Sequence, residues 1–233
     1  MSRSTPDAAP RFAMAPWRFS GTVFGAAMNH RGALAVLGAA AHQPPYKAPP
    51  AGPVLYIKPR NTLIAAGGAA LVDDDVPELE VGAALGLVIG RTACAVRVDD
   101  ALDHLAGVIV VADFSAPYDS HFRPQIRFKA RDASCAFGPA VVPPGEAGDI
   151  DALGVRVVVD GLLAHETTTG ERIRGAAQLI AEVSDFMTLS PGDVLLTGIA
   201  FGAPRVGAGA AIVVEIDGLG RLQTRVDKAP PRP

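Results

Sequence analysis

Two Asp-Gly dipeptides constrain the fold of this chain more than any other feature. Asp160-Gly161 and Asp217-Gly218 each stand between two short runs rich in β-branched and apolar residues. Asp-Gly favours the tightest hairpin turns, because both residues tolerate a positive φ. The runs on either side are therefore predicted as paired antiparallel strands: Val155–Val159 with Leu162–His165, and Ile212–Ile216 with Leu222–Val226.

Only one segment predicts a long helix. In Ile173–Met187, apolar and small residues recur at helical spacing and form one face. Thr168-Thr169-Gly170-Glu171, just upstream, fits a capping box for that helix. Further strands are predicted at Thr22–Ala27, Val81–Ile89 and Gly107–Asp113, and short helices at Gly32–Ala41 and Asp99–Leu105. This order predicts a mainly β (α+β) fold, not a βαβ sheet.

The expected domain organisation is simple. Residues 1–18 are predicted to be a disordered tail, and residues 19–53 a small strand, helix and proline-rich loop region. Residues 54–227 form the main domain, and residues 228–233 a proline-rich tail.

Composition excludes several classes of function. A net charge of −3 gives no general attraction to nucleic acid or to anionic lipid. The longest apolar runs, such as Leu85–Ile89, are far shorter than the ~20 residues that cross a bilayer. The two cysteines, Cys94 and Cys135, are far apart and outside any metal-ligand spacing. We therefore expect a cytoplasmic enzyme with a small-molecule ligand, no nucleic acid and no membrane.

Eight short blocks stand in a characteristic order along the chain. They are Asn29-His30-Arg31, Tyr46–Pro50, Tyr56–Thr62, Leu87–Arg91, Val111–Ser115, Lys129–Asp132, Pro191–Gly198 and Glu215–Gly220. Each block is weak alone, and the ordered set is specific. Together the blocks resemble the fumarylacetoacetate hydrolase superfamily. Within it, they are similar to the N-terminal half of the bifunctional decarboxylase/isomerases of homoprotocatechuate (4-hydroxyphenylacetate) breakdown.

The resemblance implies a mixed β-roll/sandwich of the fumarylacetoacetate hydrolase C-terminal type that usually dimerises. It also implies Mg²⁺ or Mn²⁺ held by carboxylates, which would chelate a 2-oxo acid and stabilise its enolate. The expected assembly is a homodimer, or a heterodimer with a homologous C-terminal-type subunit.

One departure from the family pattern bears on the metal. The family's Glu-x-Glu pair falls at Gly82 and Ala84, and neither residue has a side chain that can bind a cation. Glu78 and Glu80 have the right mutual spacing but lie four residues too early, about 13 Å along a strand. Asp113 is then the only expected metal ligand, and one carboxylate holds a hard divalent ion poorly.

The candidate site residues follow from the matched blocks. Lys129, Asp113 and His30 are predicted to be catalytic. Arg127, Lys129 and Arg131 alternate, so in a strand they would form one cationic row facing a polycarboxylate substrate. Lys58 and Thr197 complete the predicted substrate-binding set. For each residue the alternative is structural: a turn carboxylate for Asp113, a solvated edge strand for the cationic row.

Three functions remain open. The first is a subunit of 5-oxopent-3-ene-1,2,5-tricarboxylate decarboxylase and 2-hydroxyhepta-2,4-diene-1,7-dioate isomerase. The second is a non-catalytic structural subunit paired with a metal-competent paralogue, which Gly82 and Ala84 favour. The third is an acylpyruvate-type hydrolase, which needs a carboxylate to orient His30 that the sequence does not supply.

Overall fold

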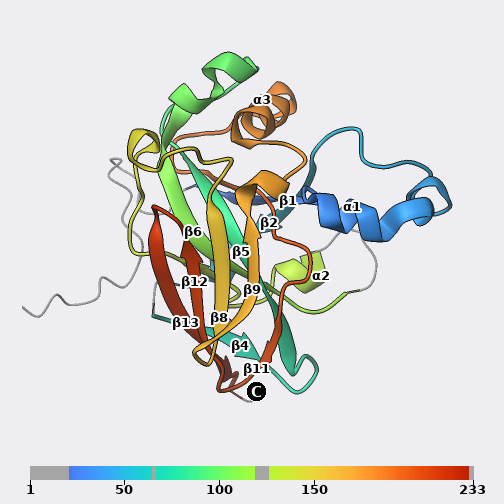
Figure 1. Cartoon of the computed structure of the whole chain (residues 1–233), viewed down its shortest axis with the longest axis vertical. Coiled ribbons are helices and arrows are strands. Elements are labelled where there is room, and N and C mark those ends of the chain that lie inside the picture. Colours follow the sequence, from blue (N-terminus) through green and yellow to red (C-terminus); the bar gives the residue numbers. More distant parts are fainter. Residues whose placement is uncertain (1–20, 65–66, 119–125, 231–233) are drawn as a thin grey trace, which may run out of the picture.

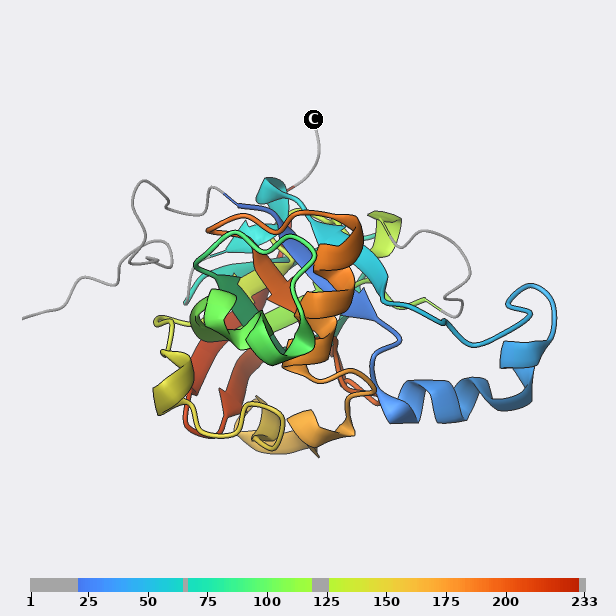
Figure 2. The ribbon, with the colours of Figure 1, turned by 90° about the horizontal axis from the view of Figure 1, so that it is seen from above.

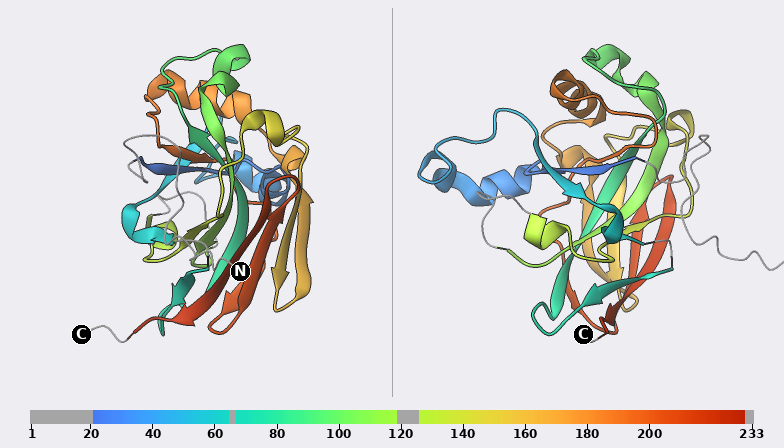
Figure 3. Two further views of the ribbon diagram at one scale, coloured as in Figure 1. Left: turned by 90° about the vertical axis from the view of Figure 1, so that its left-hand side faces the viewer. Right: turned by 180° about the vertical axis from the view of Figure 1, so that it is seen from behind.

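The computed structural model describes residues 21–64, 67–118 and 126–230 of the chain. Two β-sheets lie side by side as layers, with the longest helix, α3, across one end (Figures 1 and 3). The predicted mainly β, α+β architecture is confirmed. The predicted tail over residues 1–18 lies outside the described residues.

The first sheet has the strand order β2-β1-β10-β5-β6-β7-β3, with β11 pairing to β5. The strand of the predicted N-terminal region, β1, thus lies inside this sheet, parallel to β10 and antiparallel to β2. The strands are β1 Val23–Ala27, β2 Val54–Lys58, β3 Leu63–Ile64, β5 Glu78–Ile89, β6 Leu105–Ser115, β7 Cys135–Phe137, β10 Val194–Leu196 and β11 Arg205–Gly207.

The second sheet has the order β4-β13-β12-β8-β9 and contains both predicted hairpins. Asp160 and Gly161 have φ values of 50° and 81°, as the β8–β9 turn requires. β13 runs to Lys228, so the predicted C-terminal tail begins one residue inside a strand. The strands are β4 Ala69–Val72, β8 Gly154–Val159, β9 Leu162–Thr168, β12 Ala211–Ile216 and β13 Gly220–Lys228.

The helices are α1 Arg31–Leu37, α2 Ile126–Lys129 and α3 Ala176–Phe186. Short 3-10 helices cover Gly38–His42, Arg60–Thr62, Val98–His104, Pro144–Glu146 and Thr169–Glu171. The predicted capping box is wrong: Thr168 caps the 3-10 turn by accepting from the Gly170 N–H, and α3 starts later. The α3 N-terminus is instead capped by the Asp151 carboxylate, which accepts from the Ala176 N–H at 3.0 Å.

The main core lies between the two sheets, and β5 shows how it positions the site. Alternate residues such as Leu85 and Leu87 face the second sheet, whereas Ala84 and Val88 belong to a smaller cluster on the opposite face. Because side chains alternate along a strand, Gly82 and Glu80 lie on that opposite face too. The predicted functional strand positions are therefore on the outer face of the first sheet.

The segment after β1 extends away from both layers. Viewed from above, α1 and the following 3-10 helix form an arm beside the sheets (Figure 2). None of the α1 residues is buried. The base of this arm, where β1 meets α1, is one wall of the cavity described next.

Candidate functional site

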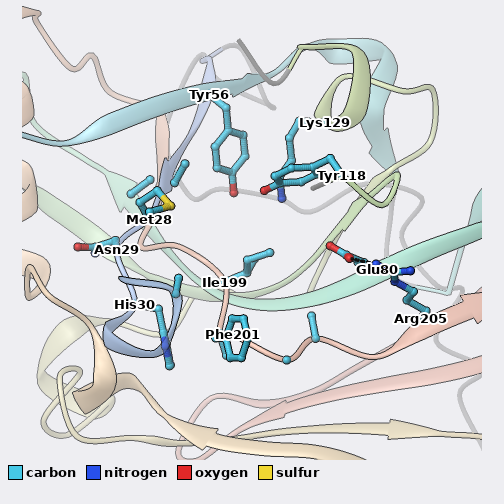
Figure 4. Close-up of a pocket in the computed structure, with 16 residues that line it drawn as sticks. Met28, Asn29, His30, Tyr56, Glu80, Tyr118, Lys129, Ile199, Phe201 and Arg205 are labelled. Atoms are coloured by element: carbon cyan, nitrogen blue, oxygen red, sulfur yellow. Dashed lines mark hydrogen bonds and ion pairs between the residues drawn. The ribbon is translucent and has the colours of Figure 1, made fainter. Parts of the chain in front are cut away.

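A cavity of about 310 Å³ lies between the end of β1, the outer face of β5 and the segment leading to β11 (Figure 4). Its volume falls at the small end of the range typical for ligand pockets. The polar side chains that line it are Asn29, His30, Tyr56, Glu80, Tyr118, Lys129 and Arg205.

Behind Lys129 and Tyr56 lies a fully buried carboxylate, Asp113. Its oxygens form ion pairs with Lys58 Nζ at 2.8 Å and with Lys129 Nζ at 3.0 Å. The Tyr56 hydroxyl donates a short hydrogen bond to the same carboxylate. We call these four residues the lysine cluster; Lys129 and Tyr56 line the cavity, whereas Asp113 does not.

Local sequence explains why the cluster forms. Tyr56 pairs with Gly25 across β1 and β2, and a Cβ on Gly25 would lie 2.1 Å from the Tyr56 ring. Only glycine there lets the ring lie over β1 and reach Asp113. Lys58, on the same face of β2, is fixed by bonds to the carbonyls of Phe114 at 2.6 Å and Ser134 at 3.0 Å.

The lysine cluster shifts the pKa of its members in opposite directions. Burial alone would raise the pKa of Asp113, but Lys129, Lys58 and the Tyr56 hydroxyl outweigh it and hold that pKa below its ordinary value. Burial lowers the pKa of Lys129, with Lys58 acting in the same direction and Asp113 against it. Burial raises the pKa of Tyr56 well above its ordinary value, so its hydroxyl stays protonated.

The base of the arm, where β1 meets α1, supplies another wall of the cavity through Asn29 and His30. Asn29 is buried; it donates to the carbonyls of Arg174 and Thr197 and accepts from the Arg174 N–H. It therefore fixes where α1 begins. His30 caps α1: its Nδ1 accepts from the Gly32 N–H at 3.1 Å.

That hydrogen bond fixes the tautomer of His30. Because Nδ1 is an acceptor, the neutral ring carries its proton on Nε2. Nε2 is buried and finds no partner in the described part of the chain. Burial lowers the pKa of His30, although the nearby Glu171 opposes the shift. The lowered pKa favours the neutral form of the ring.

Glu80 and Arg205 bound the cavity on a further side (Figure 4). They form an ion pair at 3.2 Å, between a Glu80 side chain that is 20% exposed and an Arg205 side chain that is 52% exposed. Glu80 thus reaches the cavity despite lying too early for the family pair. Its side chain is engaged by Arg205, not by the lysine cluster.

Only some of the predicted site residues line the cavity. Lys129 and His30 line the cavity, while Asp113 and Lys58 lie behind it. Thr197 is buried, donates to the Leu85 carbonyl and does not line the cavity.

The predicted cationic row is wrong. Residues 126–129 form the short helix α2, so Arg127 and Lys129 do not alternate along a strand. Lys129 turns inward and is buried, whereas Arg127 and Arg131 line a different cavity, beside Asp75 and Glu78. Arg131 is bound there to Asp73 at 2.6 Å.

Most of the chain matches one protein family. Residues 22–227 match the model of the fumarylacetoacetate (FAA) hydrolase C-terminal family. The chain belongs to the fumarylacetoacetate hydrolase family. This confirms the resemblance seen in the ordered sequence blocks.

The chain is similar in sequence to curated proteins with different activities, among them a bifunctional isomerase/decarboxylase and a tautomerase. A 4-hydroxyphenylacetate degradation bifunctional isomerase/decarboxylase from Escherichia coli is 36% identical over 206 residues, which is 88% of this chain and 47% of that protein. The chain therefore spans about half the length of that relative. A mitochondrial oxaloacetate tautomerase from Xenopus laevis is 31% identical over 76% of this chain and 59% of its own length.

Solved structures agree on the fold. Fumarylpyruvate hydrolase from Pseudomonas aeruginosa, solved in complex with Mn²⁺ and pyruvate, gives a TM-score of 0.77 at 24% identity, covering 98% of this chain and 99% of that one. The 2-hydroxyhepta-2,4-diene-1,7-dioate isomerase from Mycobacterium marinum gives 0.74 at 24% identity, over 91% and 77%. At this identity they establish the fumarylacetoacetate hydrolase fold alone.

The residues present do not fit the divalent metal that the family implies. A Cβ at Gly82 would lie 2.2 Å from Ile199 Cγ2 and 2.9 Å from the Asp113 carbonyl. Ile199 therefore fills the space that the side chain of the first glutamate of the family's Glu-x-Glu pair would need. Ala84 is buried in an apolar cluster. Asp113 is already paired to two ammonium groups. Within the described ranges, no group of three His, Cys, Asp or Glu residues could hold a metal.

Several lining residues are not predicted from the sequence. Tyr56 and Asn29 stand inside the matched blocks, but neither type titrates near neutral pH, so neither is predicted as a site residue. Ile199-Ala200 follows Thr197-Gly198 at the place where the family usually has Thr-Pro; that departure is the available sequence signal for the filled metal position. Arg205 carries no signal, because only the β11–β5 pairing brings it to Glu80.

Proposed function

We propose that this chain is a subunit of the decarboxylase and isomerase acting on 5-oxopent-3-ene-1,2,5-tricarboxylate and 2-hydroxyhepta-2,4-diene-1,7-dioate in aromatic (4-hydroxyphenylacetate) catabolism. The observation that carries the proposal is the buried Lys129 ammonium on the wall of a small cavity. The likeness to half of a bifunctional isomerase/decarboxylase supports the choice of substrates.

The chemistry needs a fixed positive charge near the keto oxygen. When CO₂ leaves, the C–C bond to the departing carboxylate breaks, and its electron pair moves through the conjugated double bond onto the keto oxygen. Lys129 would stabilise the negative charge that develops there. A proton then adds to the dienolate oxygen and gives the dienol; in the tautomerisation that O–H proton is lost while a proton adds to carbon. Asp113 acts as a positioning residue, because its ion pair at 3.0 Å fixes the Lys129 ammonium.

A structural role is the second candidate, favoured by Gly82, Ala84 and Ile199. In this form of the proposal the subunit pairs with a homologous, metal-competent chain that performs the chemistry. The chain spans 47% of its bifunctional relative, which leaves room for such a second half in the same assembly.

The hydrolase candidate is disfavoured by His30. A water-activating histidine needs a free acceptor nitrogen and a carboxylate that orients the ring. Here Nδ1 already accepts from the Gly32 N–H, and Nε2 of the neutral ring holds the proton. Hydrolysis by this chain would therefore require a different base.

The test is a turnover assay on the purified chain, alone and mixed with a homologue that carries the Glu-x-Glu pair. Release of CO₂ from the tricarboxylate by the chain alone, lost in Lys129→Met, would support the catalytic form. Turnover only in the mixture, at the same rate with Lys129→Met, would support the structural form. Absence of turnover in both preparations would contradict both.

A further inference from the structure

The lysine cluster carries more positive than negative charge. Lys58 and Lys129 both pair with one carboxylate, Asp113, and the Tyr56 hydroxyl stays neutral. The cluster therefore has a formal charge of +1 in a place where each charged side chain is buried. Such an excess charge is unfavourable in a dry environment unless an anion compensates it.

The uncompensated charge faces the cavity. Lys58 is surrounded by Phe114, Ser134 and Asp113 and does not line the cavity, whereas Lys129 does. Across residues 21–64, 67–118 and 126–230, the Lys129 ammonium donates one hydrogen bond, to Asp113, of the three that it can make. Its ammonium also lies 4.7 Å from the centre of the Tyr56 ring, which fixes its direction.

The same features oppose a divalent cation. An ion beside Asp113 would lie next to two ammonium groups, whose repulsion is strong in a site of low dielectric constant. Ile199 occupies the space that a ligand on Gly82 would need. The cavity thus presents an ammonium group beside Asp113, the carboxylate that the family pattern predicts as a metal ligand.

We infer that the cavity binds a small 2-oxo carboxylate or dicarboxylate without any divalent cation, with the Lys129 ammonium as the cation that pairs with it. This rests on the proposed function for its substrate class and adds how the substrate is held. The volume of about 310 Å³ suits an anion of this size.

The experiment is a calorimetric titration of oxalate, and separately of pyruvate, into the full chain. One arm contains EDTA and the other contains Mg²⁺. Binding is expected in both arms, with dissociation constants equal to within about twofold, because the ammonium supplies the charge-assisted contact. Lys129→Met should weaken binding by about tenfold or more, and Lys129→Arg by less.

The matched control is Lys228→Met, which removes an exposed lysine that pairs with Asp74 and is not among the residues lining the cavity. It should bind oxalate like the wild type. Binding that requires Mg²⁺, binding that survives Lys129→Met, or absence of binding in EDTA would each overturn the inference. Because binding is measured without turnover, a chain that binds oxalate in EDTA yet releases no CO₂ would fail only the proposed function.

Discussion

Two carboxylates on the same outer face of the first sheet have opposite environments. Asp113 is fully buried and paired to two lysines, whereas Glu80 is partly exposed and paired to the exposed Arg205. They lie on adjacent strands, since Gly82 pairs with Asp113 and Glu80 with Ser115. Solvent access, and not spacing along the strand, therefore decides which carboxylate anchors the site.

Asp113→Asn should have the largest effect. The substitution keeps the shape of the side chain but leaves Lys58 and Lys129 as buried cations without a counter-charge. We expect a loss of unfolding free energy on the order of 3–5 kcal/mol, measured by urea denaturation. A loss below about 1 kcal/mol would mean that water reaches the cluster and screens its charges.

Gly82→Glu tests whether the missing ligand can be restored. The new side chain would collide with Ile199, because a Cβ on Gly82 would stand only 2.2 Å from Ile199 Cγ2. We expect a destabilisation of about 1–3 kcal/mol from overpacking and no gain of Mn²⁺ binding. Adding Ile199→Ala should recover part of the stability. A stable single variant that binds Mn²⁺ would show that the metal position is not filled.

His30 and His165 should lose their contributions to stability at a higher pH than the lysine cluster does. Burial lowers the pKa of His30 and of His165, so between their folded values and about 6.5 the unfolded chain binds more protons. Their contribution to stability is therefore complete above about pH 6.5 and is lost as the pH falls through the folded values. That of Asp113, whose folded pKa is depressed, is lost only at much lower pH.

The test for the histidines is a thermal melt at pH 7 and at pH 5. His30→Asn preserves an N-cap acceptor for the Gly32 N–H but does not titrate in this range. The wild type should lose more melting temperature on acidification than this variant. An identical loss in both proteins would mean that His30 does not carry the effect.

Glu80→Gln should have the smallest effect. Its ion pair with Arg205 is partly solvated, so we expect a change in unfolding free energy of about 0–1 kcal/mol. The comparison with Asp113→Asn is made in the same buffer by the same denaturation assay. Equal losses at the two positions would contradict the contrast between the buried and the solvated carboxylate.

The fold is largely predictable because its signals are local. Asp160-Gly161 specifies a turn by its own φ preferences, and the β8–β9 hairpin follows. The periodicity of its apolar residues predicts helix α3 but not where it starts, because the cap comes from Asp151, far upstream in the sequence.

The site is only half predictable because it depends on contacts between distant segments. Lys129 is identified by its block, yet its inward direction depends on α2, a short helix where alternation suggests a strand. Lys58, Lys129 and Asp113 come together from three separate elements, β2, α2 and β6. Ile199, which fills the space beside Gly82, lies more than a hundred residues from it in the sequence. Neither arrangement can be read from spacing alone.

The most direct test of the metal-free site is the electron paramagnetic resonance signal of free Mn²⁺ in the presence of the full chain, with and without oxalate. Bound Mn²⁺ loses this signal, so its amplitude counts the free ion. An amplitude equal to that of buffer, with and without oxalate, is what the lysine cluster predicts. A stoichiometric loss of signal that oxalate strengthens and Asp113→Asn abolishes would contradict it, and would place a metal beside Asp113.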